Sequence, residues 1–314
     1  MKRWVQIILV AAIIAGLVIF VRHHSDYIKK ALDLKPSYIF MLVALVIVGR
    51  VLAGLRIKLI VELFDVRLSF MEWFGTAVIT NFYNCFLFKG GTALTAVYLK
   101  NRHRLNFTRY ASLNVGVIVI VMLVSAMTGL ACSLYGYIKG AFDLPLVLIF
   151  GAMLAGVAVM MLMPKFRFPD VAVLRPFNTL LECWEMMRSR RGTVLKLLVL
   201  EAAVLTAFSI RYYIAFRMFS TAVPLYICFI LSPFNIISNV LSLIPSGYGV
   251  KEALVGAVSK IARTGFTEGV MATMINRVLM MLVAFALAPV FSYFLVGNFN
   301  LKVKTDDEIC REGA

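Results

Sequence analysis

Residues 222–262 read AVPLYICFILSPFNIISNVLSLIPSGYGVKEALVGAVSKIA, an apolar stretch that is interrupted near its middle. The interruption runs from Pro245 to Gly249, and a second helix-like piece, residues 250–262, follows it. Proline removes a backbone donor and glycine lets the chain turn sharply, so one straight helix cannot continue through this point. Such a break at membrane depth survives only where protein or a watery cavity satisfies the freed backbone groups. The stretch therefore predicts a re-entrant helical hairpin hinged at Pro245, Gly247 and Gly249.

The first half of the chain contains a similar interruption. The apolar residues 73–88 stop at Lys89-Gly90-Gly91, and a modest helix-like piece follows at 92–101. This pattern predicts a second re-entrant hairpin, with Lys89 at its tip and Gly90 and Gly91 as its hinge.

Long apolar runs fill most of the remaining chain. Hydrophobic residues make up 61% of the 314 positions, charged residues 15%, and the mean hydropathy is +0.90, whereas a soluble domain averages about 45–50% apolar and about 25% charged residues. Runs long enough to cross a bilayer lie at 4–21, 37–59, 110–138, 144–163, 193–219 and 270–296. We expect an all-α polytopic membrane protein with about six full spans plus the two re-entrant hairpins. It would form a single integral membrane domain over 1–314, with a short cytoplasmic tail at 298–314.

The distribution of basic residues predicts the orientation. The net charge is +16, and no basic stretch lies in a polar domain of the kind that binds nucleic acid. With the N-terminus inside, 19 Lys and Arg fall on the cytoplasmic side and 5 on the other. The segments assigned to the cytoplasm are 1–3, 56–72, 100–109, 164–196 and the tail. The positive-inside rule thus predicts a multi-pass protein of the prokaryotic plasma (inner) membrane, with both termini cytoplasmic.

The two halves of the chain share a short motif. Arg104-Leu105-Asn106-Phe107-Thr108 follows the first predicted hairpin, and Arg263-Thr264-Gly265-Phe266-Thr267 follows the second, 159 residues later. We therefore predict two repeats, at about 4–138 and 144–297. The first repeat holds three full spans, so the second starts on the other side of the membrane and is inverted. Inverted repeats with broken helices are typical of transporters that work by alternating access.

Charged residues inside apolar segments are costly, and they usually have a function or a partner. A buried arginine matches phosphate geometrically and stays charged, so cations in or beside the apolar segments are candidate headgroup ligands. The candidate substrate-binding residues are Arg50, Lys89, Lys251 and Arg277. Glu252 and Glu201 are candidates for gating or coupling. Arg50, Arg211 and Arg217 could instead snorkel towards an interface, and Glu201 could be a static partner of an arginine.

Catalytic and metal-binding signatures are scarce. The sequence contains no GxSxG, HExxH or GxxxxGK[ST] motif. The five cysteines lie far apart, without a CxxC pair. We therefore expect no catalytic residues, no metal and no cofactor, and a protein that is not an enzyme.

The second hairpin also carries a family resemblance. Residues 243–253, LIPSGYGVKEA, followed by Gly265, Ala272 and Arg277, are similar to the signature of the lysylphosphatidylglycerol synthase transmembrane-region family, also called flippase-like domain proteins. Residues 81–99 resemble the family's other motif, although Phe88-Lys89 replaces its usual proline-containing version.

The resemblance implies a lipid flippase fold in which Glu252 and Arg277 stand at the family's central polar positions. It also implies a link to aminoacylated phosphatidylglycerol, or to hopanoid, glycolipid or polyprenyl-linked sugar pathways. Bifunctional members add a soluble aminoacyltransferase domain. This chain shows no such segment, so we expect a stand-alone member without synthase activity.

Together these features predict a flippase-like transporter that moves an anionic or phosphate-bearing lipid between leaflets, with that lipid as its partner. Three alternatives stay open. They are an accessory subunit bound to a lipid-synthesis or glycolipid-synthesis enzyme, a membrane-embedded transferase acting on a lipid-linked substrate, and a transporter of small ions or solutes.

Overall fold

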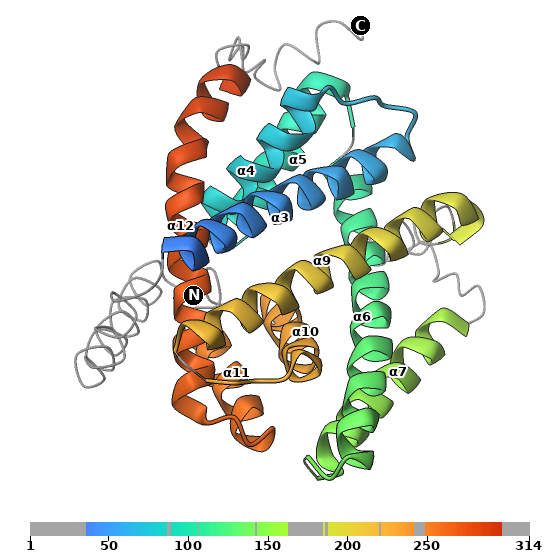
Figure 1. The fold of residues 1–314 in the computed structure, drawn as a ribbon. Helices are drawn as coiled ribbons and strands as arrows, with labels where there is room; N and C mark the ends of the chain where they lie inside the picture. Colours follow the sequence, from blue (N-terminus) through green and yellow to red (C-terminus); the bar gives the residue numbers. More distant parts are fainter. Residues whose placement is uncertain are drawn as a thin grey trace, which may run out of the picture.

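The structure is a computed structural model in which every described element is a helix (Figure 1). It describes residues 36–86, 89–105, 107–141, 143–162, 185, 188–219, 221–241 and 249–296. The predicted span at 4–21, the hinge residues Pro245 and Gly247, and the tail at 298–314 lie outside these residues.

Four helices are long and apolar enough to cross a membrane, which confirms an all-α membrane protein. They are α3 (Pro36–Glu62), α6 (Phe107–Ile138), α9 (Arg191–Met218) and α12 (Phe266–Val296). At about 1.5 Å per residue each exceeds the bilayer core of about 30 Å. The predicted span at 144–163 corresponds to α7 (Pro145–Leu162), an apolar helix of 18 residues and so the shortest of the predicted spans in the described residues.

The two predicted hairpins are both helix pairs. The first consists of α4 (Phe70–Phe86) and α5 (Gly90–His103), and the second of α10 (Leu225–Leu241) and α11 (Val250–Ile261). In each pair the two helices pack against each other. All four have 17 residues or fewer, so each is shorter than the four long helices.

Gly91 lets the helices of the first hairpin approach each other closely. A Cβ atom at this position would collide with the backbone of Thr80 in α4. The Gly91 N–H donates to the Asn84 side-chain oxygen at 2.9 Å, and the hydroxyls of Thr80 and Thr95 lie 2.5 Å apart. The double glycine therefore serves a tight helix contact as well as a turn.

The helices are arranged in matching pairs. In Figure 1, α12 and α6 stand on opposite sides, α4 and α5 lie above, α10 and α11 lie below, and α3 and α9 run between them. α4 packs on α12 just as α10 packs on α6, and α3 packs on α4 just as α9 packs on α10. Among these eight helices, exchanging α3 with α9, α4 with α10, α5 with α11 and α6 with α12 reproduces the same set of neighbours.

The hairpin ends repeat the same correspondence in the backbone. The residues that precede α5 and α11, Lys89 and Gly249, have φ values of 50° and 76°. The residues that follow, Arg104 and Arg263, have φ values of 54° and 58°. Left-handed backbone is uncommon outside glycine, and both arginines of the shared motif adopt it.

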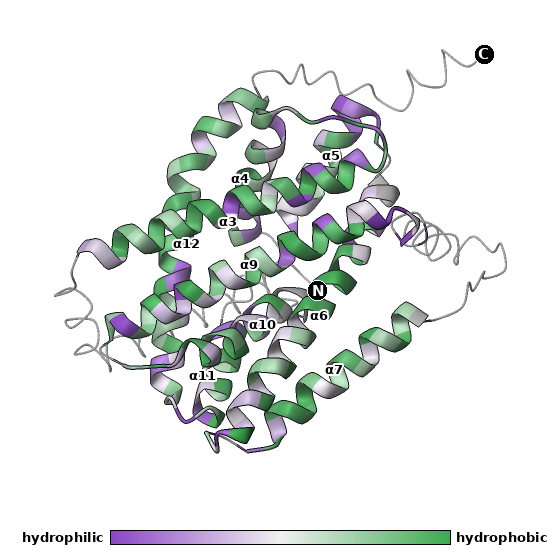
Figure 2. Cartoon of the chain, turned by 45° about the vertical axis from the view of Figure 1, so that its right-hand side comes forward, coloured by the Kyte–Doolittle hydropathy of each residue, from purple (hydrophilic) through white to green (hydrophobic). Residues whose placement is uncertain are grey.

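The outer surface is largely apolar. Figure 2 shows hydrophobic residues along α3, α7 and α9, and hydrophilic residues at the C-terminal end of α5. Large side chains such as Phe40, Val199 and Tyr293 are exposed. Apolar surface of this extent is expected where lipid is the solvent.

Candidate functional site

Charged side chains from four helices gather in the interior, and we call them the central cluster. Its members are Arg50 of α3, Arg211 of α9, Lys251 and Glu252 of α11, and Arg277 of α12. Arg50 is partly buried and the other four are buried. Arg50 is within electrostatic range of both Arg211 and Lys251, and Lys251 is within range of Arg277 and Glu252. The fold thus brings together three of the four predicted substrate-binding residues, and adds Arg211.

An ion pair between α11 and α12 lies in this cluster. Arg277 Nη1 is 2.7 Å from Glu252 Oε1, and both side chains are less than a tenth exposed. The second carboxylate oxygen, Oε2, is buried and accepts no hydrogen bond from the described residues. Glu252 thus pairs with Arg277, and its carboxylate retains an acceptor that other donors could use.

Arg50 has a weak partner. Its Nη2 donates to the thioether sulfur of Met280 at 3.4 Å, and its buried Nε makes no hydrogen bond within the described residues. A thioether is a poor acceptor for a guanidinium group. Arg50 is thus held in place without being neutralised.

Arg211 is held by neutral groups. Its Nε donates to Asn276 Oδ1 at 3.0 Å and its Nη2 donates to the Asn276 backbone oxygen at 3.2 Å. The guanidinium also lies over the Phe208 ring, 4.9 Å from its centroid. With 1% of its surface exposed, Arg211 does not snorkel. Arg217, by contrast, is exposed and donates to the Tyr213 hydroxyl, as snorkelling predicts.

The tips of both hairpins adjoin the cluster. Cys85, at the end of α4, is within electrostatic range of Arg50, Lys251 and Arg277. Lys89, four residues later, is exposed just before α5. Lys251 and Glu252 themselves lie in the first turn of α11, where free backbone N–H groups and the helix dipole favour a negative charge.

Glu201 is placed apart from the Arg277–Glu252 pair. Its carboxylate binds Arg56 of α3, with Arg56 Nη2 2.7 Å from Oε2, and the Glu201 side chain is almost fully buried. This ion pair joins α3 and α9 where they cross. The static-partner alternative for Glu201 agrees with this geometry, and its predicted gating role stays a prediction.

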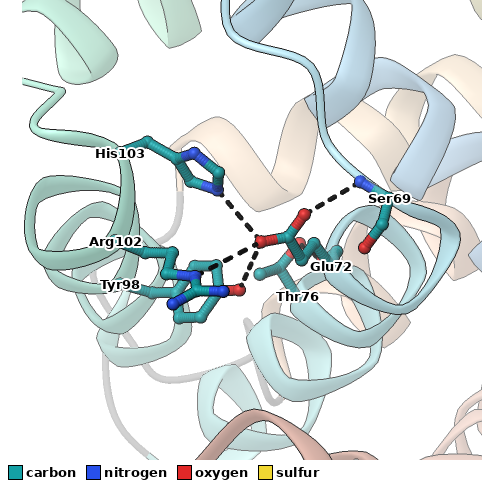
Figure 3. A network of polar contacts seen from close by, with 6 residues as sticks. All are labelled: Ser69, Glu72, Thr76, Tyr98, Arg102 and His103. Atoms are coloured by element: carbon teal, nitrogen blue, oxygen red, sulfur yellow. Dashed lines mark hydrogen bonds and ion pairs between the residues drawn. The ribbon is translucent and has the colours of Figure 1, made fainter. Parts of the chain in front are cut away.

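A second polar network joins the start of α4 to the end of α5 in the first hairpin (Figure 3). The sequence analysis did not predict it. Glu72, in the first turn of α4, accepts from Tyr98 at 3.1 Å and contacts His103 Nε2 at 3.0 Å, both in α5. Arg102 Nε is 4.0 Å away. The Ser69 backbone N–H donates to Glu72 Oε2 at 2.9 Å. The Ser-x-x-Glu spacing, which is typical of a helix capping box, is the sequence signal for this last bond.

These contacts set the protonation state of Glu72. Burial by itself would raise the pKa of its carboxyl, but hydrogen bonds from Ser69, Tyr98 and His103 outweigh that effect and lower the pKa below its ordinary value of 4.5. Glu72 is therefore ionised at neutral pH and ties α4 to α5.

Fold and site together define a multi-pass α-helical membrane protein with a buried, mostly cationic cluster between two helical hairpins. The chain belongs to the family described as the lysylphosphatidylglycerol synthase TM region, which matches residues 7–288. The family places it among membrane proteins of lipid metabolism or translocation. No curated protein and no solved structure matches the chain.

Proposed function

We propose that this protein moves an anionic or phosphate-bearing lipid between membrane leaflets by alternating access. The observation that carries the proposal is the central cluster, in which four basic side chains and one carboxylate lie inside an apolar helical protein. Ionised groups inside a membrane protein are expensive and mark substrate pathways. Because guanidinium groups bind phosphate in a bidentate manner, an anionic headgroup suits this site while its tails stay in the lipid.

The matching helix pairs support a repeat whose two halves can exchange their packing arrangements. The exchange that relates the two halves preserves the helix neighbours and pairs Lys89 with Gly249 and Arg104 with Arg263. The halves are nevertheless packed differently, because α11 lies closely along α12 whereas α5 contacts α6 over a short stretch. In our proposal, each half adopts the other's packing when the site opens to the opposite side.

Ion pairs at the helix ends support the proposed topology. Asp65 and Arg190 are 3.9 Å apart, and both lie on segments assigned to the cytoplasm. Asp143 and Arg263 are 3.7 Å apart. In the proposed topology α6 ends on the exterior side just before Asp143, and the second hairpin, which Arg263 follows, opens to the same side. Each contact joins segments that the basic-residue distribution places on the same side.

The test is headgroup translocation in proteoliposomes, using fluorescent anionic and aminoacylated lipids. We expect protein-dependent flipping that falls at least tenfold in Glu252→Gln and in Arg277→Ala, because each variant removes a charge-assisted contact of about 1.5–3 kcal/mol. Arg217→Ala is the matched control, since Arg217 is exposed and should not affect transport. Flipping at the wild-type rate in both site variants would refute the site. No flipping of any lipid by the wild-type protein would refute the transporter and favour a subunit of a lipid-synthesis enzyme.

A further inference from the structure

The central cluster has a large excess of positive charge. The cluster contains four basic side chains, Arg50, Arg211, Lys251 and Arg277, and one carboxylate, Glu252, which gives a formal charge of +3. Five other described carboxylates are paired elsewhere. Glu62, Asp65, Glu72, Asp143 and Glu201 pair with Lys58, Arg190, His103, Arg263 and Arg56 respectively.

Nothing in the described residues offsets this excess. Arg50 is held by a thioether and Arg211 by an asparagine, and both partners are neutral. Burying an unbalanced charge is costly, and neighbouring like charges add repulsion. An anion bound among these side chains removes both costs, and the acceptors that now hold Arg50 and Arg211 are weak enough to be displaced.

The size of the excess positive charge limits which anionic headgroups can balance it. A phosphodiester supplies one negative charge, and an aminoacylated phosphodiester adds an ammonium group that the cluster would repel. A phosphomonoester carries about −1.5 to −2 at neutral pH, and a diphosphate ester carries more. The multiply charged headgroups are thus the ones that come closest to balancing a formal charge of +3.

Building on the proposed function, we propose that the central cluster selects a lipid whose headgroup is a phosphomonoester or a diphosphate ester over an aminoacylated phosphodiester. Arginines from α3, α9 and α12 surround the headgroup, and the first turn of α11 supplies Lys251 and its backbone N–H groups. Glu252 holds Arg277 in position.

The test compares ligands that share one tail and differ in charge. Binding of farnesyl diphosphate, farnesyl phosphate and the methyl ester of farnesyl phosphate to the purified full chain is measured in detergent, together with short-chain lysyl-phosphatidylglycerol. We expect the first two to bind at least tenfold more tightly than the last two, because each charge-assisted hydrogen bond that a ligand cannot make weakens its binding about tenfold or more. Arg50→Gln and Arg211→Gln should each reduce this preference about tenfold, whereas the exposed-site control Arg190→Gln should leave it unchanged.

The outcomes separate the charge preference from the transport function. Equal or tighter binding of lysyl-phosphatidylglycerol overturns the charge preference, whether or not lipid is flipped. If inorganic pyrophosphate binds as tightly as farnesyl diphosphate, the ligand is a soluble anion, and the proposal that the site selects a lipid is refuted. Tight farnesyl diphosphate binding without flipping in proteoliposomes supports the selectivity and refutes the proposed transport. Should Arg50→Gln or Arg211→Gln fail to fold, the comparison of the four ligands on the wild-type protein decides the charge preference by itself.

Discussion

Arg277 and Glu252 illustrate how strongly a buried ion pair depends on both partners. Either residue alone would leave a charge in a site that is less than a tenth exposed. Removing one partner of a buried pair typically costs about 3–5 kcal/mol, whereas replacing both with apolar groups is often close to neutral. The pair is therefore better understood as a device that orients Arg277 than as a source of stability.

This argument predicts non-additive mutations. We expect Arg277→Met alone to destabilise the protein by about 3 kcal/mol, and the double change with Glu252→Met to recover most of that loss. Thermal unfolding in detergent measures both, and Lys58→Met with Glu62→Met is the control because that pair is exposed. Additive losses at the central pair would mean that the two residues do not stabilise each other.

Gly91 predicts a second single-residue effect. Gly91→Ala places a methyl group against the Thr80 backbone, and overpacking of this kind costs about 1–3 kcal/mol. Gly151→Ala is a matched control in α7, where nothing lies within 4 Å of the added atom and helix propensity favours alanine by up to about 1 kcal/mol. We expect the two substitutions to shift the unfolding temperature in opposite directions. A neutral Gly91→Ala would show that the hairpin helices can move apart freely.

At the scale of elements, Glu72 joins the start of α4 to the end of α5 in the first hairpin. The lowered pKa of Glu72 means that its contribution to stability is fully present above its ordinary value of 4.5 and is lost as the pH falls through the lower, folded-state value. Glu72→Gln should therefore lower the unfolding temperature at pH 7, and the difference from wild type should shrink below about pH 4.5. A difference that stays constant down to pH 3 would show that the charge of Glu72 is irrelevant.

Element positions could be predicted well from the sequence, and contacts between elements could not. Hydropathy placed α3, α6, α9 and α12, and glycine and proline placed both hairpins, because these signals depend on local composition. Glu201 was a candidate for gating, yet it contacts Arg56 because the rotation of α3 and α9 about their axes is set by packing across the whole protein. Arg211 could be recognised as costly, but its Asn276 partner is 65 positions away in the chain.

The network at Glu72 was missed for a related reason. In the sequence, Arg102 and His103 directly follow the helix-like piece predicted at 92–101. They therefore look like ordinary basic loop residues that set topology. Only the antiparallel packing of α4 and α5 brings them to Glu72. The Ser-x-x-Glu spacing was the one local sign that Glu72 has a structural role.

At the scale of the whole molecule, the proposed topology can be tested by which side of the membrane each helix end faces. The ion pairs Asp65–Arg190 and Asp143–Arg263 lie at helix ends that the proposed topology puts on opposite faces. Lys100 closes α5 on the cytoplasmic side of that topology, and Lys139 follows α6 on the exterior side, and both are exposed. An inverted repeat requires this sidedness, since equivalent hairpins must open in opposite directions.

The sidedness gives a direct measurement. Lys139→Cys should react with a membrane-impermeant maleimide in right-side-out vesicles, and Lys100→Cys should react only in inside-out vesicles. The parent protein corrects for its own thiols, of which Cys85 and Cys228 are buried. Labelling of both positions from one side would mean that α6, which lies between them, does not cross the membrane. The proposed topology would then be wrong, and the exchange of packing between the halves could not carry a headgroup from one leaflet to the other.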